Sequence, residues 1–379
     1  MAEKLTNEQQ AAVDSRERSL LVSAAAGSGK TKVLVERLFS YVEREGADLD
    51  DFLIITYTRA AASELRGKIA KALTERMERD PGNYHLRQQM LRVYRADIKT
   101  VDAFCTALLR ENCHLLGEDA RGHALRPDFR VLDENEAQVL RERVLARTLD
   151  DFYDCLTPGG TLLADTLGAG RDDSALEDLV LELHAKLQAQ PYEDKWLEAQ
   201  RAFWRAVPDK IEDTPYGKIL LNEVRRKARH CKNLLQRAAQ EMCANDALNQ
   251  KYAPAFLDAS YQLEALEGKT AEGWDAARGV TIAFPRLAAV KDSDGGEMKA
   301  RMKSLWDNCK ETVKGFAEIF SASSDEAVED LRTMASAMLA LIDLTADFSR
   351  RYNEEKRRRN SADFSDQEHE AIRLLIGED

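Results

Sequence analysis

The sequence has few of the residues that mark small, cross-linked or extended proteins. Its 379 residues include only 19 glycines and 8 prolines, which excludes a collagen-like or low-complexity chain. No apolar run approaches the roughly 18 residues of a membrane span, and the N-terminal MAEKLTNEQQ has no apolar signal core. We therefore expect a cytoplasmic protein with no membrane partner. The cysteines form no C-x-x-C pair and no zinc-ligand spacing with histidine, and we interpret them as reduced core thiols: Cys105, Cys113, Cys155, Cys231, Cys243 and Cys309.

Acidic charge is distributed unevenly along the chain. The whole sequence carries 55 Lys+Arg against 67 Asp+Glu, a net charge of −12. Residues 1–115 hold 18 of the basic and 17 of the acidic residues, so the excess of acid lies further along the chain. Because phosphate binding depends on the local field of a groove, the global charge does not exclude a nucleic-acid partner.

Short apolar runs alternate with helical patterns over the first hundred residues. SLLVSA (19–24), FLIITYT (52–58) and IKTVDAF (98–104) are rich in β-branched or aromatic residues and predict buried strands. Segments 31–45 and 59–80 repeat apolar residues at i, i+3, i+4 and i+7 and predict helices. This order predicts βαβ units and a parallel sheet. After about residue 130 the helical spacing continues with little alternation, which predicts a mostly α-helical body.

The strongest chemical signal is SAAAGSGKT, residues 23–31, between a predicted strand and a predicted helix. It fits the phosphate-binding pattern G-x-x-x-x-G-K-[ST], except that Ala24 stands at the place of the first glycine. The loop glycines would fold backbone N–H groups around the phosphates at a helix N-terminus. Lys30 would reach the β- and γ-phosphates and the Thr31 hydroxyl would ligate Mg²⁺, which makes this pair the predicted catalytic residues. The predicted triphosphate site comprises Ala24, Ala25, Ala26, Gly27, Ser28, Gly29, Lys30 and Thr31.

A glutamine lies upstream of this loop, in LTNEQQAAV (5–13). The carboxamide of Gln9 offers a donor and an acceptor side by side, which matches the N6 and N7 edge of adenine. Thr6-x-x-Gln9 is also an ordinary capping box that opens a helix. The sequence leaves both interpretations open, and we predict that Gln9 faces the adenine of ATP.

Two later segments carry polar and aromatic side chains where a predicted strand passes into a helix. These segments are ITYTRAAASELRGKI (55–69) and IKTVDAFCTALLREN (98–112). Hydroxyls, a cation and aromatic rings at the carboxyl ends of parallel strands suit a sugar-phosphate backbone. An ordinary strand-to-helix junction is the alternative for each segment. The predicted contacts with single-stranded DNA are Thr58, Arg59, Thr100 and Phe104, and Phe104 could equally be a core residue.

Taken together, these four segments resemble the UvrD-like branch of superfamily 1 DNA helicases. The matched motifs are L-x-x-x-Q-x-x-A-V, A-x-A-G-S-G-K-T with alanine at its first place, T-x-T-x-x-A-A-x-E-[ML] and T-[IV]-x-x-F-C. Within that branch, KTVDAFC together with FRVLDENEAQVL (129–140) and SADFSDQEHEAIRLL (361–375) is similar to the AddA subunit of AddAB-type helicase-nucleases, with RecB-type proteins as neighbours.

The resemblance implies an α/β fold, a P-loop NTPase (RecA-like) parallel sheet with a large, mostly α-helical insertion domain. It implies an ATP-binding domain 1A at residues 1–125, a helical 1B insertion at 126–360 and a return into domain 1A at 361–379. The implied activity is ATP-driven unwinding of DNA ends in double-strand break repair and recombination, with ATP and Mg²⁺ as cofactors. The implied partners are single-stranded and double-stranded DNA and a second, AddB-like helicase-nuclease subunit.

The Walker B strand of that family, an apolar run that ends in D-E-[FY]-Q-D, has no counterpart in this sequence. Asp133-Glu134, like Asp363 and Asp366, precedes a helical pattern, and we interpret these acids as helix caps. We therefore expect an N-terminal fragment that stops ahead of Walker B and is inactive alone. The competing hypothesis is a non-catalytic, nucleotide-dependent module that docks a protein partner through its acidic helical domain. The long helical insertion disfavours a small-molecule P-loop kinase.

Overall fold

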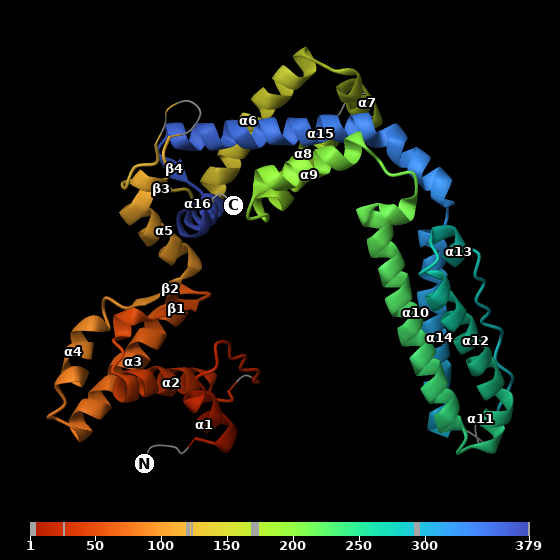
Figure 1. Cartoon of the computed structure of the whole chain (residues 1–379), viewed down its shortest axis with the longest axis horizontal. Helices are drawn as coiled ribbons and strands as arrows, with labels where there is room; N and C mark the ends of the chain where they lie inside the picture. The colour runs from red at the N-terminus through yellow and green to blue at the C-terminus, as the bar shows by residue number, and fades with distance from the viewer. Residues whose placement is uncertain are drawn as a thin grey trace. The chain divides into compact units, whose positions relative to one another are not determined.

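The computed structural model of the chain describes residues 5–25, 27–118, 122, 124–167, 174–291 and 296–377. The chain divides into two compact units, one formed by Met1–Val144 with Arg350–Asp379 and the other by Leu145–Ser349. Figure 1 labels the helices and strands of both units. The described residues are mostly helical, and their strands form two small parallel sheets, β1-β2 and β3-β4.

The elements of the first unit alternate between helices and short strands. In chain order they are α1 (Asn7–Asp14), α2 (Lys30–Glu45), η1 (Leu49–Asp51), β1 (Leu53–Thr56), α3 (Arg59–Arg79), α4 (Tyr84–Arg92), β2 (Asp97–Thr100), α5 (Val101–Asn112), η2 (Cys113–Leu115), β3 (Arg130–Val131), the start of α6 (Glu134–Asp154), the end of α15 (Ser324–Arg358), β4 (Ser361–Ala362) and α16 (Phe364–Ile376).

The first parallel sheet brings two strand-to-helix junctions to the same edge. β1 and β2 run parallel, with Thr56 opposite Thr100 at their carboxyl ends. α3 follows β1, and the side chain of its N-cap Thr58 accepts a hydrogen bond from the Ala61 N–H. α5 follows β2, and its N-cap Thr100 accepts one from the Ala103 N–H. The two segments singled out in the sequence therefore begin their helices side by side.

The strand predictions at 52–58 and 98–104 hold for part of each range. β1 covers 53–56 and β2 covers 97–100, but residues 101–104 already belong to α5 because Thr100 caps that helix. The expectation that β1 is fully buried is wrong, since Leu53 and Ile55 on one of its faces are 51% and 42% exposed.

The strand predicted at 19–24 is absent from the described structure. These residues have no strand assignment, and Leu21 is 94% exposed. A strand needs a neighbour that takes up its N–H and C=O groups, whereas β1 and β2 pair only with each other among the described residues. The β-forming residues are present at 19–24, but the hydrogen-bonding partner is not.

The helices around this sheet bury apolar residues at helical spacing. In α2 the buried set includes Val35, Leu38, Phe39 and Val42, and in α3 it includes Ala62, Leu65, Ile69 and Leu73. Each set lies on one face of its own helix. The two sets pack with Leu86 of α4 and Ile98 of β2 in a single core. The helices predicted at 31–45 and 59–80 are confirmed to within one residue at each end.

The chain returns to the first unit after α15. Asn360 has a φ of 48°, a left-handed conformation that often ends helices, and its side-chain oxygen accepts from the Arg126 N–H at 2.9 Å. β4 then pairs with β3 in parallel, and α16 packs on α5 over Leu109, Phe129 and Ala362. The return segment therefore forms part of the same core as the helix that follows β2.

The acidic residues that were interpreted as caps do cap helices. An oxygen of Asp133 accepts from the Glu136 N–H at 2.9 Å at the start of α6. Asp363 and Asp366 form a reciprocal capping box at the start of α16, where each side chain accepts from the backbone N–H of the other. These interpretations are confirmed.

The second unit is helical. Its described elements are the end of α6, α7 (Pro158–Leu167), α8 (Ser174–Gln188), α9 (Glu193–Arg205), η3 (Ile211–Asp213), α10 (Pro215–Met242), α11 (Asp246–Lys251), α12 (Ala253–Lys269), α13 (Trp274–Arg278), α14 (Gly296–Ile319) and most of α15. Figure 1 shows α10, α12 and α14 side by side, and their core includes the stacked rings of Phe256 and Trp306, 4.8 Å between centroids.

Two sequence expectations about apolar segments and thiols can be compared with this structure. Among the helices that the structure describes, none combines the length and apolar character that a bilayer crossing requires. The cysteines are free, as expected, but the interpretation as core thiols is wrong for Cys155 and Cys243, which are exposed.

Candidate nucleotide and DNA sites

The loop at 23–31 has the backbone conformation expected of a phosphate-binding loop. Gly27 and Gly29 have φ of 79° and 84°, in the left-handed region that favours glycine. α2 begins at Lys30, and the first N–H groups of a helix have no acceptor within it. Thr31 is exposed in this first turn. Ala26, a further residue of the predicted site, lies outside the described residues.

The Lys30 ammonium lies among carbonyl groups of its own loop. It donates to the carbonyl oxygen of Ala25 at 2.9 Å and also to that of Ala24. The Ser28 hydroxyl donates to the same Ala25 oxygen at 2.7 Å. Backbone amides, an ammonium and hydroxyls gathered at a helix N-terminus suit a polyphosphate, and the Thr31 hydroxyl oxygen is a ligand type that Mg²⁺ accepts. The residues present therefore fit Mg-ATP.

Metal-binding carboxylates do not gather near this loop in the described part of the chain. No group of three or more His, Cys, Asp or Glu side chains there could hold a metal ion.

Gln9 joins α1 to the phosphate-binding loop. Its Oε1 accepts from the Thr6 N–H at 3.0 Å and Thr6 Oγ1 accepts from the Gln9 N–H, so the capping-box interpretation is confirmed. Its Nε2 donates to the Ser28 carbonyl oxygen at 3.0 Å. A Cβ added at Gly29 would lie 3.2 Å from this nitrogen, which shows how closely the side chain approaches the loop. Contact with adenine stays a prediction.

A groove of about 720 Å³ in the first unit contains two of the four predicted DNA contacts. α3, β2, α5, the segment 131–133 from the end of β3 to just before α6, and α16 supply its lining. Arg59 and Thr100 line it, whereas Thr58 and Phe104 are not among its lining residues. Thr58 is exposed at the start of α3, and Phe104 is half-buried on α5. The parallel pairing of β1 and β2 is the reason that Arg59 and Thr100 share one groove.

Positive charge predominates in this groove. Four cationic side chains line it, against the two carboxylates Asp102 and Asp133; the cations are Arg59, Arg66, Lys99 and Arg110. A concave surface lined mainly by one sign of charge concentrates the field that attracts a polyanion. The near-neutral charge of residues 1–115 therefore conceals a local basic site.

The four cations differ in their freedom to bind a ligand. Arg66 donates to the carbonyl oxygens of Ala96 and Ile98, at 3.2 and 3.0 Å, and so supports the backbone that leads into β2. Lys99 pairs with a neighbouring aspartate, with 2.6 Å between Nζ and the Asp97 carboxylate. Arg59 and Arg110 form no ion pair with any residue that the structure describes. The Arg110 guanidinium lies 5.5 Å from the centroid of the Phe129 ring. Because neither of these two cations is neutralised by a carboxylate, they are the ones that we expect to contact phosphates.

The groove also includes two residues of the segment 361–375 that the sequence did not predict as DNA contacts. Phe364, 42% exposed, is the first residue of α16, and the buried Gln367 follows one turn later. The Thr106 hydroxyl of α5 donates to Gln367 Oε1, which ties α16 to the opposite wall. In the sequence the available signal was an aromatic residue directly after a helix cap. The other segments that line the groove lie more than 230 residues earlier in the chain, so the pattern alone could not show what this ring faces.

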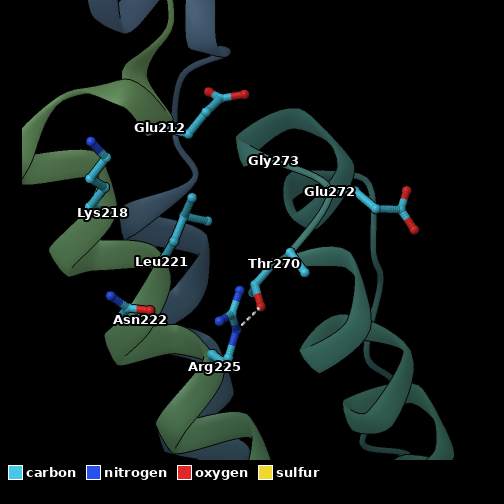
Figure 2. Close-up of a pocket in the computed structure, with 9 residues that line it drawn as sticks. Glu212, Lys218, Leu221, Asn222, Arg225, Thr270, Glu272 and Gly273 are labelled. Atoms are coloured by element: carbon cyan, nitrogen blue, oxygen red, sulfur yellow. Dashed lines mark hydrogen bonds between the residues drawn. The ribbon is translucent and has the colours of Figure 1, made fainter.

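The second unit has a smaller pocket, of about 240 Å³, between the start of α10 and the end of α12 (Figure 2). Figure 2 shows Arg225 reaching across to Thr270, and the hydrogen bond between Nε and Oγ1 is 2.9 Å long. A carboxylate oxygen of Glu212 accepts from the Ser324 hydroxyl at 3.2 Å. Two carboxylates, Glu212 and Glu272, offset the two cations Lys218 and Arg225 here, so this pocket lacks the concentrated positive charge that a phosphate ligand needs.

The sequence matches the model of the UvrD/REP helicase N-terminal domain over residues 5–379. Since this match covers nearly all of the chain, the chain belongs to the UvrD/REP helicase family.

Relatives in several bacteria show which type of UvrD/REP helicase the chain resembles. The chain is similar to the A-type subunit of the ATP-dependent helicase/nuclease from Ruminiclostridium cellulolyticum, with 31% identity over 99% of this chain and 30% of the relative. The proteins of the same name from Alkaliphilus oremlandii and Desulforudis audaxviator are each 34% identical over 98% of this chain, which covers 31% and 30% of their lengths. The AddA-type resemblance is thus confirmed, and the chain spans about 30% of the length of these relatives.

Proposed function

We propose that this chain is the ATP-binding part of an ATP-dependent DNA helicase/nuclease subunit that unwinds DNA ends in double-strand break repair and recombination. The observation that carries this proposal is the cation-lined groove in the same compact unit as the phosphate-binding loop. A helicase couples nucleotide binding to movement of the DNA strand, so we expect the two sites to be connected through the fold. We propose that the protein acts in the cytoplasm.

The nucleotide part of the proposal is based on the loop. Gly27, Gly29 and the first turn of α2 would present backbone N–H groups to the triphosphate, with Lys30 compensating its charge and Thr31 on Mg²⁺. Bound Mg²⁺ supplies Lewis-acid stabilisation of the charge that develops on the phosphates. Gln9 would exchange its hydrogen bond with the Ser28 carbonyl for the edge of adenine. The fold around this loop is proposed to be RecA-like.

The DNA part of the proposal is based on the groove. Arg59 and Arg110 would contact phosphates, and the exposed ring of Phe364 would stack on a base. Thr58 and Thr100, at the starts of their helices, would help to position the sugar-phosphate backbone of the DNA. Because these contacts involve phosphates and the face of a base, binding would be independent of sequence.

The remaining parts of the activity concern the longer relatives. Their name assigns them both helicase and nuclease activity. We propose that the protein to which this chain corresponds also binds duplex DNA and assembles with a second, AddB-like subunit. Without Walker B carboxylates, the chain by itself is expected to bind Mg-ATP and to hydrolyse it very slowly.

Two single substitutions test the proposal because the two sites are separate. Lys30→Ala should abolish binding of a fluorescent ATP analogue and leave binding of a labelled oligo(dT) unchanged. Arg59→Ala should weaken oligo(dT) binding and leave the nucleotide unaffected. Arg79→Ala provides a matched control, since it removes the same charge from the other end of α3. A chain that binds nucleotide but no DNA would favour the docking-module hypothesis instead.

A further inference from the structure

A buried charge cluster lies at the junction of α15, β4 and α16. The Lys356 side chain is 1% exposed, and its Nζ lies 2.9 Å from Asp363 Oδ2 and 2.7 Å from Asp366 Oδ1. The Tyr352 hydroxyl donates to the same Asp363 oxygen at 3.0 Å. The ammonium also lies 4.0 Å from the centroid of the buried Tyr352 ring. A lysine is seldom buried so fully unless carboxylates pair with it, as they do here.

The two carboxylates of this cluster also form the capping box that begins α16. Each Asp therefore has one oxygen on the ammonium and the other on a backbone N–H, with 2.9 Å for both of the capping contacts. Although burial alone would raise the pKa of Asp363, the Lys356 ammonium and the Asp366 N–H hold it at about 2. The direction and starting point of α16 thus depend on a cation that belongs to α15.

The first turn of α16 supplies one wall of the groove. Phe364 follows Asp363 directly and lines the groove, as does Gln367. Gln367 Nε2 donates to the Asp363 carbonyl oxygen at 3.2 Å and its Oε1 accepts from Thr106 on α5. Any shift of the capping box would therefore move Phe364 relative to the cations of α3 and α5.

We propose that Lys356 is a positioning residue for DNA binding: it holds the Asp363–Asp366 cap so that Phe364 lies on the wall of the groove. This inference rests on the proposed function, because it requires the groove to bind single-stranded DNA. Lys356 itself is buried and touches no DNA. Its effect on affinity passes through the ring of Phe364.

A double-mutant cycle on oligo(dT) affinity at low salt tests this proposal. Phe364→Ala should weaken binding by about 5- to 150-fold, the range for loss of one stacked base. Lys356→Met should weaken it by most of the same factor. In the double variant, Lys356→Met should add less than about two-fold to the loss from Phe364→Ala, because the ring that it positions is already absent. Factors that multiply, or an unchanged affinity in Lys356→Met, would overturn the proposal.

Two further variants keep the test decisive. Arg358→Met removes an exposed cation two residues along the same helix, and it should leave oligo(dT) affinity unchanged if general charge is not the cause. If circular dichroism shows that Lys356→Met does not fold, Tyr352→Phe, which removes only a hydroxyl, replaces it in the cycle. Tyr352→Phe should weaken oligo(dT) binding less than Lys356→Met would, and this loss should disappear when Phe364→Ala is also present. A loss that persists in the double variant, or no loss in Tyr352→Phe alone, overturns the proposal. If Arg59→Ala and Phe364→Ala both leave affinity unchanged, the proposed function itself has failed.

Discussion

The proposed binding of single-stranded DNA should weaken as salt rises, to an extent set by the contacts of the four groove cations. Arg66 and Lys99 already have protein partners, which leaves Arg59 and Arg110 to displace counterions from phosphates. Each neutralised phosphate of a single strand contributes about 0.7 to the slope of log affinity against log salt, so two give about 1.4. Affinity should then fall about seven-fold between 50 and 200 mM salt.

Arg59→Ala should halve this dependence. One remaining phosphate contact predicts a slope of about 0.7 and a loss of only about 2.6-fold over the same salt range. The assay is fluorescence anisotropy of labelled oligo(dT) at several salt concentrations. Arg79→Ala serves as the control because it lies at the far end of the 21-residue helix α3, roughly 30 Å away. An equal slope in Arg59→Ala and in the unsubstituted chain would refute the assignment of Arg59 to a phosphate.

Four more substitutions test single contacts. Lys30→Ala should abolish binding of a fluorescent ATP analogue, and retained binding would show that the loop is not the triphosphate site. Gln9→Ala should weaken ATP by about 1 to 3 kcal/mol more than GTP or CTP, measured by competition, whereas equal losses would reduce Gln9 to a helix cap. Phe104→Ala should lower stability by about 1 to 3 kcal/mol in urea unfolding and leave oligo(dT) affinity unchanged, since its half-buried ring does not line the groove. A loss of affinity without loss of stability would instead support the prediction that this ring stacks on a base. The Lys356 ammonium and the Asp366 N–H lower the pKa of Asp363 to about 2, so the stability that this carboxylate contributes is present above pH 4 and is lost as pH falls toward 2. Burial raises the pKa of Asp366, which opposes part of this contribution. Asp363→Asn should flatten the acid limb of a circular dichroism titration, and an unchanged limb would contradict the pairing.

Sequence reasoning succeeded where neighbouring residues determine the structure. The glycines, lysine and threonine of the phosphate-binding loop lie within nine consecutive residues, so their pattern specifies both the left-handed backbone and the helix that follows. The helices α2 and α3 follow from apolar spacing alone. Helix caps such as Asp133 are equally local, since each side chain bonds a backbone N–H only three residues away.

Tertiary structure decided everything that required distant segments to meet. The apolar run at 19–24 has the composition of a strand, but it needs a hydrogen-bonding neighbour that the described residues do not provide. The groove combines Arg59, Thr100 and Phe364, which come from three separate parts of the chain. In the sequence, Lys356 is one of several cations in a basic stretch of helix. Only the fold buries it and pairs its ammonium with the Asp363 carboxylate. Local patterns carry no information about such pairings, because they depend on how the cores of separate helices and strands pack together.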